Sequence, residues 1–551
     1  MGGLKTFDFV VANFPFSVKN WTSGLDPAND LHNRFEYGIP PAKNGDYAFL
    51  LHILKSLKST GKGAVIHPHG VLFRGGAEAV IRKRLVQQGV IKGIIGLPAN
   101  LFFGTGIPAC LLVVDKEGAA GRKGIFMIDA SRGCIKDGNK NRLRAQDIHK
   151  IADTFNRQIE IERYSRLVPL AEIEANDCNL NLPRYIDSSE PEDRQDIEAH
   201  LKGGIPEADI DGLSAWWQVF PGVRQALFAE ADRPGYSQLT IPAAGIKPAI
   251  FDHPEFTAFN RRVTDAFNQW RDASRPRLTA IRIGDRPKAL IEVLSESLLE
   301  AFRADTRIAG LIDPYGVYQH LLDYWTATML DDVWMLDAEG WSAMQEPSVA
   351  PGQAGKPNTD LIPPALIVAR YFADEQAAIE QLETERDAIS RELEELDEEH
   401  GGDDGLLAEA RNDKGKLTRA SVKARLADIK HDAEADAERR VLKRYADLID
   451  QEAAAGKRVR DAQKALETRV AARYAQLTEA EIQTLVVDDK WLAALAASVQ
   501  GELDRVSQSL TGRIRQLAER YATPLPRLAE EVESLAARVD EHLRKMGFDW
   551  R

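Results

Sequence analysis

The first 130 residues alternate between short apolar runs and segments whose apolar residues recur every three or four positions. Continuous apolar runs predict buried strands, whereas the longer period predicts amphipathic helices. Helices are expected from Asp46 to Gly61 and from Ala77 to Gly89, where a glycine ends each pattern. The predicted strands are residues 9–12, 63–68, 90–98, 109–116 and 124–131. Strands separated by helices of this length indicate an α/β unit with a largely parallel sheet.

The remainder of the chain has mostly helical patterns. Residues 140–166 carry a charged amphipathic pattern that predicts one helix, and the polar stretch 179–196 indicates a boundary. Residues 346–364 are dense in proline and glycine, which predicts a linker. We therefore expect four parts, namely an α/β domain at 1–185, a helical middle region at 186–345, that linker, and a helical region at 365–551.

In the last of these parts, the apolar residues of a long predicted helix follow two interleaved seven-residue series. They are Ile379, Leu382, Ile389, Leu393 and Leu396, with Arg386 interrupting one series. About three heptads predict a short coiled coil. The glycines of residues 401–405 end it, and a final amphipathic helix is expected within residues 525–547. The expected fold class is α/β followed by all-α, including this coiled coil.

Composition argues against membrane, secreted and metal-binding classes. No apolar run approaches the roughly 18–20 residues of a membrane span, and the N-terminus lacks the layout of a signal peptide. The three cysteines, Cys110, Cys134 and Cys178, are widely spaced and form no CxxC pair. This spacing predicts neither a disulfide framework nor a zinc site. We expect a cytoplasmic protein with no bound metal.

Charge is distributed unevenly along the chain. Residues 1–185 hold 25 Lys and Arg against 17 Asp and Glu, a net +8, and the remainder holds 46 against 67, a net −21. A basic part on an acidic chain fits contact with a polyanion such as nucleic acid. A coincidence of surface charge remains the alternative.

The segment Asn13-Phe14-Pro15-Phe16 follows the first predicted strand and carries the candidate chemistry. The asparagine amide offers an acceptor, and the residue before a proline is kept out of the helical region, so that the Phe14 carbonyl is presented to a ligand. Two oxygens and an aromatic ring match the needs of an extrahelical adenine, whose amino group donates while its ring stacks. The alternative is an ordinary strand-end turn with two core phenylalanines.

This segment resembles motif IV of amino-group DNA methyltransferases, whose pattern is Asn/Asp/Ser-Pro-Pro-Tyr/Phe. More narrowly, the chain resembles the modification (M) subunit of type I restriction–modification systems. The resemblance covers roughly residues 4–185 and 361–430. It rests on these blocks, in this order: "DFVVANFPFS", "GDYAFLLHILKSLKSTGKGAVIHPHGVLFRGG", "IRKRLVQQGVIKGIIGLPANLFFGTGIPACLLVVDK", "IFMIDASR", "LNLPRYID", "LIPPALIVARYFADEQ" and "EEHGGDDGLLAEARNDKGKLTRASVKARL".

The resemblance implies a partial Rossmann-like methyltransferase sheet and an adenine-N6 DNA methyltransferase that uses S-adenosylmethionine. By motif position, Asn13 and the Phe14 carbonyl, with Pro15, would bind the target amino group, and Phe16 would stack on the base. Asp46 and Tyr47 fall where the next motif of the family lines the cofactor pocket. The partners that the resemblance implies are DNA and a specificity (S) subunit, with a restriction (R) subunit and a second M subunit as further candidates.

Two departures from the family pattern affect this expectation. Phe14 replaces the first proline of motif IV. The replacement makes the backbone less rigid but keeps the functional group, because the role at this position belongs to a backbone carbonyl. No glycine-rich cofactor turn precedes the motif. The one downstream candidate, "LFFGTG" at residues 101–106, is followed by strand residues rather than a helix, so we expect a loop of the late sheet. The chain is thus expected to be the C-terminal portion of an M subunit, N-terminally truncated and inactive alone.

Competing interpretations remain open. The chain could be a non-catalytic assembly subunit that docks on a specificity subunit through its helical tail. A coiled-coil scaffold with a degenerate α/β remnant would have disrupted strands, whereas residues 46–130 keep a coherent pattern. His67 and His69 have no acidic or cysteine neighbour in sequence, so we expect loop residues rather than metal ligands.

Overall fold

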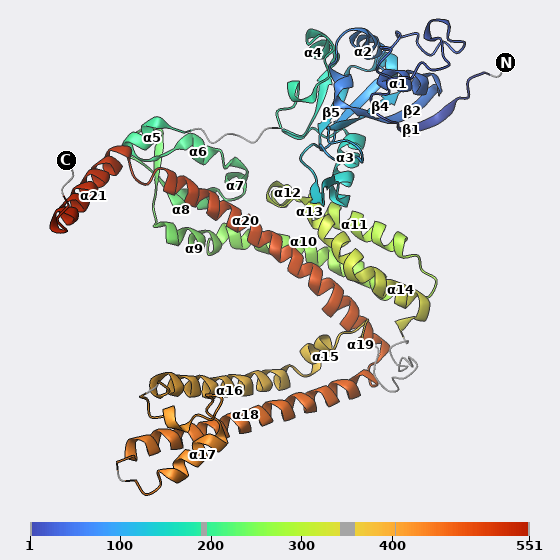
Figure 1. Ribbon diagram of the computed structural model, residues 1–551. Helices are drawn as coiled ribbons and strands as arrows, with labels where there is room; N and C mark the ends of the chain where they lie inside the picture. Colours follow the sequence, from blue (N-terminus) through green and yellow to red (C-terminus); the bar gives the residue numbers. More distant parts are fainter. Residues whose placement is uncertain (1–2, 189–194, 342–358, 403, 433, 549–551) are drawn as a thin grey trace. The chain divides into compact units, whose positions relative to one another are not determined.

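The computed structural model describes residues 3–188, 195–341, 359–402, 404–432 and 434–548 (Figure 1). The chain forms two compact units. One consists of Met1–Thr264, Ser295–Leu322 and Glu502–Arg551, and the other of Asp265–Leu294 and Asp323–Gly501. In the ranges described, no helix has both the length and the apolarity needed to cross a membrane. The expected class, an α/β region followed by a long helical region, is confirmed.

The α/β region is built on a six-stranded sheet at the start of the chain. In spatial order its strands are β1 (Phe7–Asn13), β2 (Leu57–Pro68), β4 (Ala109–Asp115), β3 (Ile91–Gly96), β5 (Gly124–Asp129) and β8 (Ser165–Pro169). The pairs β1–β2 and β3–β5 are parallel, and the other three pairs are antiparallel. The sheet is therefore mixed, and the expectation of a largely parallel sheet was wrong. Residues 97–108, between β3 and β4, form no helix that could carry a parallel crossover.

Helices cover the sheet from both sides. On one face α1 (Asp46–Lys55) and α2 (Ala77–Gln87) bury the main core, which includes Leu50, Ile81 and Val65. On the other face α3 (Ala145–Arg157) packs Ile151 and Phe155 against a smaller core over β3 and β5. The apolar positions of each helix recur at helical spacing, which is why one face of each is buried.

Two predicted helices are shorter than their sequence patterns. The chain leaves α1 at Lys55, six residues before Gly61, because Leu57 is buried at the start of β2 and pairs with Phe7. The pattern over residues 140–166 contains α3 between strand β7 (Lys140–Arg142), which pairs with β6 (Ile135–Asp137), and the first residues of β8. Strand pairing at both ends limits this helix.

The rest of the first unit is mostly helical, as predicted for the middle of the chain, but it also contains a small sheet. Strands β10 (Phe228–Glu230), β11 (Tyr236–Leu239) and β9 (Ile205–Pro206) pair antiparallel. The helices are α4 (Leu170–Ala175), α5 (Ile197–Lys202), α6 (Glu207–Asp211), α7 (Ser214–Val219), α8 (Pro221–Leu227), α9 (Ile246–Phe251), the start of α10 (Pro254–Thr279), the end of α11 (Pro287–Arg303), α12 (Thr306–Leu311), most of α13 (Pro314–Tyr324), most of α20 (Ala493–Arg520) and α21 (Leu525–Lys545). This small sheet was not predicted from the sequence, because strands of only two to four residues are too short to show an apolar pattern.

The second unit contains a pair of long antiparallel helices. Helix α16 (Ala373–His400) lies beside α18 (Asp436–Tyr474), with α15 (Pro364–Tyr371) and α17 (Arg419–Asp428) packed at the ends of the pair (Figure 1). Ile379 and Leu393, two of the predicted heptad positions, are buried. Ion pairs cross between the helices, joining Glu375 to Arg469, Glu385 to Arg458 and Glu392 to Arg444. The predicted linker lies mostly outside the described residues.

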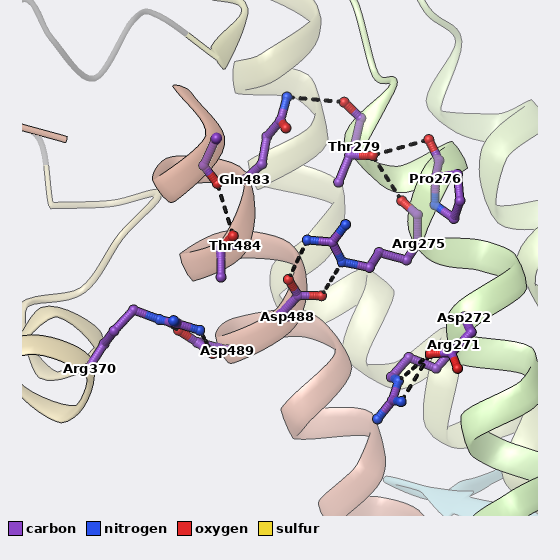
Figure 2. A network of polar contacts seen from close by, with 11 residues as sticks. Arg271, Asp272, Arg275, Pro276, Thr279, Arg370, Gln483, Thr484, Asp488 and Asp489 are labelled. Atoms are coloured by element: carbon purple, nitrogen blue, oxygen red, sulfur yellow. Dashed lines mark hydrogen bonds and ion pairs between the residues drawn. The ribbon is translucent and has the colours of Figure 1, made fainter. Parts of the chain in front are cut away.

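The second unit also contains a stretch of helix with unusually wide turns. After α19 (Glu479–Gln483), Thr484–Leu492 adopt a π-helix, a form that is rare beyond single turns. Figure 2 shows its acidic residues between basic partners: Asp488 accepts two hydrogen bonds from Arg275 at 2.8 and 2.7 Å, and Asp489 pairs with Arg370. Deeper inside, Lys490 Nζ lies 2.7 Å from the buried carboxylate of Asp332 in α14 (Leu330–Glu339).

Candidate active site

Strand β1 carries Asn13 to the carboxyl end of the sheet, where α/β proteins gather their ligands. Alternation along the strand places Asn13 on the same face as Phe9 and Val11, and turns Phe14 toward the helices on the opposite face. The Asn13 side chain is exposed and has no hydrogen-bond partner in the part of the chain that the structure describes. The Phe14 carbonyl likewise accepts no hydrogen bond there. Two adjacent residues thus each leave an oxygen acceptor available.

The side chain of Phe14 explains its departure from the family motif. Its ring stacks on Phe49 of α1, with centroids 4.5 Å apart, and meets His67 edge to face at 4.9 Å. A proline could not fill this space between the helix and the sheet. The phenylalanine therefore fixes the segment through packing, while its carbonyl accepts no hydrogen bond from the described part of the chain.

Phe16 lies on the other side of the turn, against a second loop of the sheet. Its ring meets that of Phe102 edge to face at 6.2 Å. A depression of about 630 Å³ opens between the two segments. It is lined by Asn13, Phe14, Pro15, Phe16, Ser17, Phe102, Phe103, Gly104, Thr105 and Ile107. The structure thus brings together all four predicted residues at positions 13–16.

The loop after β3 is the part of this site that the sequence reasoning missed. Residues 101–106 do form a loop of the sheet, as predicted, but residues 102–105 also line the depression. Phe103, one of these lining residues, is 94% exposed. Lys140 holds the loop by donating to the Asn100 side chain and to the carbonyls of Phe102 and Thr105, at 2.8–3.1 Å. Because β3 runs parallel to β1, its loop emerges at the same edge. The adjacent aromatic residues Phe102 and Phe103, which follow a predicted strand, were the sequence feature that could have indicated this part of the site.

Asp46 does not line the depression. It is fully buried, accepts a hydrogen bond from the Ser17 amide at 2.7 Å and pairs with Arg74 at 2.9 Å. Arg74 also pairs with Glu78 of α2, where burial raises the pKa of the glutamate. Asp46 therefore ties the turn after Phe16 to the body of the domain.

Tyr47 is buried beside Asp46, and its hydroxyl donates to the Val71 carbonyl at 2.7 Å. Burial raises the pKa of this tyrosine well above its usual range. Its hydroxyl and both carboxylate oxygens of Asp46 thus already have protein partners. The assignment of both residues to a cofactor pocket stays a prediction.

His67 is the last residue but one of β2 and is fully buried, so the expectation of a loop residue was wrong. Its strand pairs with β4 across Cys110, which draws the ring into the core. Among the residues that the structure describes, neither ring nitrogen has a hydrogen-bond partner, and burial lowers the pKa of His67 to about 4. His69 follows in a short 3-10 helix and contacts the Ala109 carbonyl. Over the described ranges, no group of histidine, cysteine and acidic residues is arranged to hold a metal ion.

Known proteins resemble the α/β region. Residues 2–194 match the model of the N-6 DNA Methylase family. The MpnII methylase subunit of a type I restriction enzyme from Mycoplasma pneumoniae is 32% identical over 194 residues, 35% of either chain. The HindI methylase subunit from Haemophilus influenzae is 33% identical over 198 residues, 34% of this chain and 44% of that protein.

Among solved structures, the methyltransferase subunit of a type I restriction–modification system from Streptococcus thermophilus is 39% identical, with a TM-score of 0.31, over 34% of this chain and 39% of that one. The chain spans about a third of the length of the first curated relatives that it matches. The expected resemblance to the modification subunits of type I restriction–modification systems is confirmed, and it is carried by residues 2–194.

Proposed function

Because residues 2–194 match the N-6 DNA methylase family, we propose that the α/β region binds an extrahelical adenine of DNA for methyl transfer to its N6. The observation that carries this proposal is a pair of oxygens, on the Asn13 side chain and the Phe14 carbonyl, that line an aromatic depression and have no hydrogen-bond partner among the residues described. Few other ligands need two acceptors and flat apolar walls together.

The chemistry follows from those acceptors. The exocyclic amino group of adenine carries two N–H donors, one for each oxygen. Accepting both hydrogens directs the nitrogen lone pair away from the ring plane, toward an incoming methyl group. Phe16 and the loop with Phe103 offer rings for stacking, which is worth about 1–3 kcal/mol per base. The base must first leave the duplex to reach these residues.

S-adenosylmethionine is the proposed methyl donor, and Asp46 and Tyr47 are proposed by motif position to line its pocket. The oxygens of Asp46 and the hydroxyl of Tyr47 are engaged by Ser17, Arg74 and Val71. The basic surplus of residues 1–185 supports contact with the DNA backbone in the same region.

Assembly is proposed for the helical regions. We assign residues 365–551 to contact with a specificity subunit, with a restriction subunit and a second modification subunit as further partners. Helix α21 supports this assignment, since one stripe along it is apolar and exposed. The stripe consists of Leu525, Leu528, Val532, Leu535 and Val539.

Methyl transfer from labelled S-adenosylmethionine to duplex DNA, in the presence of a specificity subunit, tests the proposal. We expect Asn13→Ala to lower the rate by roughly 100-fold or more, the usual cost of a lost hydrogen bond to the reacting group. Asn20→Ala, at an exposed asparagine outside the depression, is the matched control and should leave the rate unchanged. An unchanged rate in Asn13→Ala would show that the assigned role is wrong.

The second candidate function is a non-catalytic assembly subunit, and the exposed apolar stripe of α21 favours it. Calorimetry with S-adenosylmethionine separates the two functions. Absent binding and absent methyl transfer, together with retained binding to the specificity subunit, would support assembly alone. Micromolar binding of S-adenosylmethionine would contradict it.

A further inference from the structure

Two adjacent phenylalanines on the loop after β3 lie in different surroundings. Phe102 is partly buried and meets Phe16 edge to face, as described above. Phe103 is 94% exposed, the largest exposed fraction among the large apolar side chains that the structure describes. Both residues line the depression. Phe102 therefore belongs to its inner wall, whereas the ring of Phe103 projects from its rim into solvent.

A hairpin holds the loop that carries this exposed ring. Single exposed apolar side chains are common and indicate nothing by themselves. The loop of Phe103, however, is bonded to the hairpin of β6 and β7. Asn100 donates from its side chain to the Asn139 carbonyl at 2.6 Å, and Asn141 donates to the carbonyls of Ala99 and Asn100 at 2.7 and 3.0 Å. These bonds add to those of the lysine between the two asparagines of the hairpin, so the ring stands at a fixed place on the rim.

The backbone next to Phe103 leaves free space beside the ring. Gly104 has a φ of +78°, a conformation that favours glycine, and a Cβ at this position would have no described atom within 4 Å. The residues that follow, Thr105 and Gly106, add little bulk. A flat and bulky ligand can therefore approach the ring from this side without a steric conflict with the domain.

The ligand proposed for the depression indicates what the ring would meet there. An adenine that enters the depression has left a gap in the base stack, and the duplex itself stays outside the rim. Proteins that distort DNA frequently insert an apolar side chain, phenylalanine among them, between base steps. An aromatic ring stacks on any base, because every base has a π-face. A fixed and exposed phenylalanine beside the entrance for the base has the chemistry of such a wedge.

Two other roles fit the surroundings of Phe103 less well. A ring that stacked on the adenine inside the depression would lie among the lining side chains, as Phe16 and Phe102 do. An anchor for a protein partner would belong to a continuous apolar patch. The residues directly after Phe103 are glycine, threonine and glycine, which offer little apolar surface.

We propose that Phe103 inserts into the DNA duplex and occupies the space that the extruded adenine vacates. The β6–β7 hairpin holds the loop in place while the neighbouring bases press on the ring. This inference rests on the proposed function, because a wedge of this kind needs an extruded base. It concerns the duplex outside the depression, so Phe103 stabilises the extruded state and takes no part in the transfer of the methyl group.

Fluorescence of 2-aminopurine in place of the target adenine tests the proposal, because this base is quenched inside the stack and bright outside it. The full-length protein with a specificity subunit is titrated onto two duplexes, one with thymine and one with an abasic site opposite the target. We expect Phe103→Ala to reduce the fluorescence increase by about tenfold on the paired duplex. On the abasic duplex, where extrusion costs least, the reduction should be below about twofold.

Two variants serve as controls. Phe103→Tyr retains an aromatic ring and should behave like the unchanged protein on both duplexes. Leu31→Ala removes another exposed apolar side chain, which does not line the depression, and should also leave the signal unchanged. Because Phe103 is exposed, its substitution should leave the fold intact, and circular dichroism checks this.

The outcomes separate the wedge from the proposed function. An equal reduction on both duplexes would place Phe103 on the base inside the depression and overturn the wedge, as would no reduction on either. No fluorescence increase with the unchanged protein would also overturn it, whereas methyl transfer to unlabelled DNA would still be measured separately. If Asn13→Ala left the transfer rate unchanged but Phe103→Ala failed only on the paired duplex, the wedge would stand and the role of Asn13 would be wrong.

Discussion

The α/β region and the helical unit formed by Asp265–Leu294 and Asp323–Gly501 place their polar groups differently. At the end of β1, the Asn13 amide and the Phe14 carbonyl have no partner among the residues described. In the helical unit, the buried carboxylate of Asp332 accepts from both Lys490 and Trp491. Paired groups hold helices in place, whereas unpaired groups at a strand end are available to a ligand. Substitution of a paired group should therefore lower the free energy of unfolding, whereas substitution of an unpaired group should affect ligand binding.

The largest effect on stability is expected at Lys490. Lys490→Met leaves the Asp332 carboxylate buried with only the Trp491 indole, and burial already raises the pKa of this aspartate. Loss of one partner of a buried pair costs about 3–5 kcal/mol. Urea unfolding of the full chain measures the change. The double variant Asp332→Asn/Lys490→Met, which removes the charge and keeps an acceptor for Trp491, should lose less. A loss below about 1 kcal/mol in Lys490→Met would show that the pair is not needed.

His67 departs from this comparison, because its ring nitrogens have no hydrogen-bond partner in the described ranges although the residue lies inside the core. Its pKa in the folded state is about 4, below the ordinary value of 6.5, so the unfolded state binds more protons between these pH values. Stability contributed by the neutral ring is therefore complete above about pH 6.5 and falls with pH, by about 3 kcal/mol near pH 4.

Substitution of this histidine tests that pH dependence. We expect His67→Leu to remove it, measured as protection of the Val65–His67 amides from hydrogen exchange at pH 7.5 and pH 5. His542→Gln, at an exposed histidine of α21, should retain it. Equal pH dependence in all three proteins would show that His67 does not titrate as stated.

Asp46 connects the paired and the unpaired polar groups of the α/β region. Its buried side chain is paired with Arg74 and, through the Ser17 amide, holds the segment that follows Asn13 and Phe14. Asp46→Ala removes the acceptor for the Ser17 amide and the partner of Arg74. A hydrogen bond to a charged group contributes about 1.5–3 kcal/mol. We expect faster exchange of the Ser17 amide and lower stability. Asp46→Asn, which retains an acceptor for Ser17, should restore most of the protection at that amide. Equal exchange in Asp46→Ala and the unchanged protein would contradict the role.

The smallest effect is expected for the ion pair between Arg275 and Asp488 (Figure 2), although both of its hydrogen bonds are short. Both side chains are partly exposed, and ion pairs in contact with solvent contribute about 0–1 kcal/mol. Arg275→Met should lower the free energy of unfolding by less than about 1 kcal/mol, and 0.5 M salt should reduce the difference further. If Arg275→Met lowered the free energy of unfolding as much as Lys490→Met, solvent exposure would not explain the difference expected between the Arg275–Asp488 and Lys490–Asp332 pairs.

Apolar periodicity predicted most elements of the α/β region, because each strand and helix buries one side in a shared core. It predicted neither the direction of β4 nor the end of α1 at Lys55. Strand direction depends on where the chain returns, and the end of a helix next to a strand depends on pairing such as that of Leu57 with Phe7. Both are tertiary properties that local pattern does not contain.

The same limit applies to the candidate site. Residues 13–16 were recognisable because their chemistry is contiguous in sequence. The loop with Phe102 and Phe103 joins them only after β4 has been inserted between β2 and β3. Asp46 was placed in a pocket by motif position, whereas its contacts with Ser17 and Arg74 depend on the packing of α1 against the turn.

The contacts of Lys140 have a consequence for the energetics of any ligand that enters the depression. Three acceptors of the loop between Asn100 and Thr105 already bind one ammonium group. The conformational entropy of that loop is therefore lost when the domain folds and not when the ligand arrives, which leaves more of the interaction energy for affinity. Lys140 thereby makes this side of the site a preformed wall, with a ligand-independent shape.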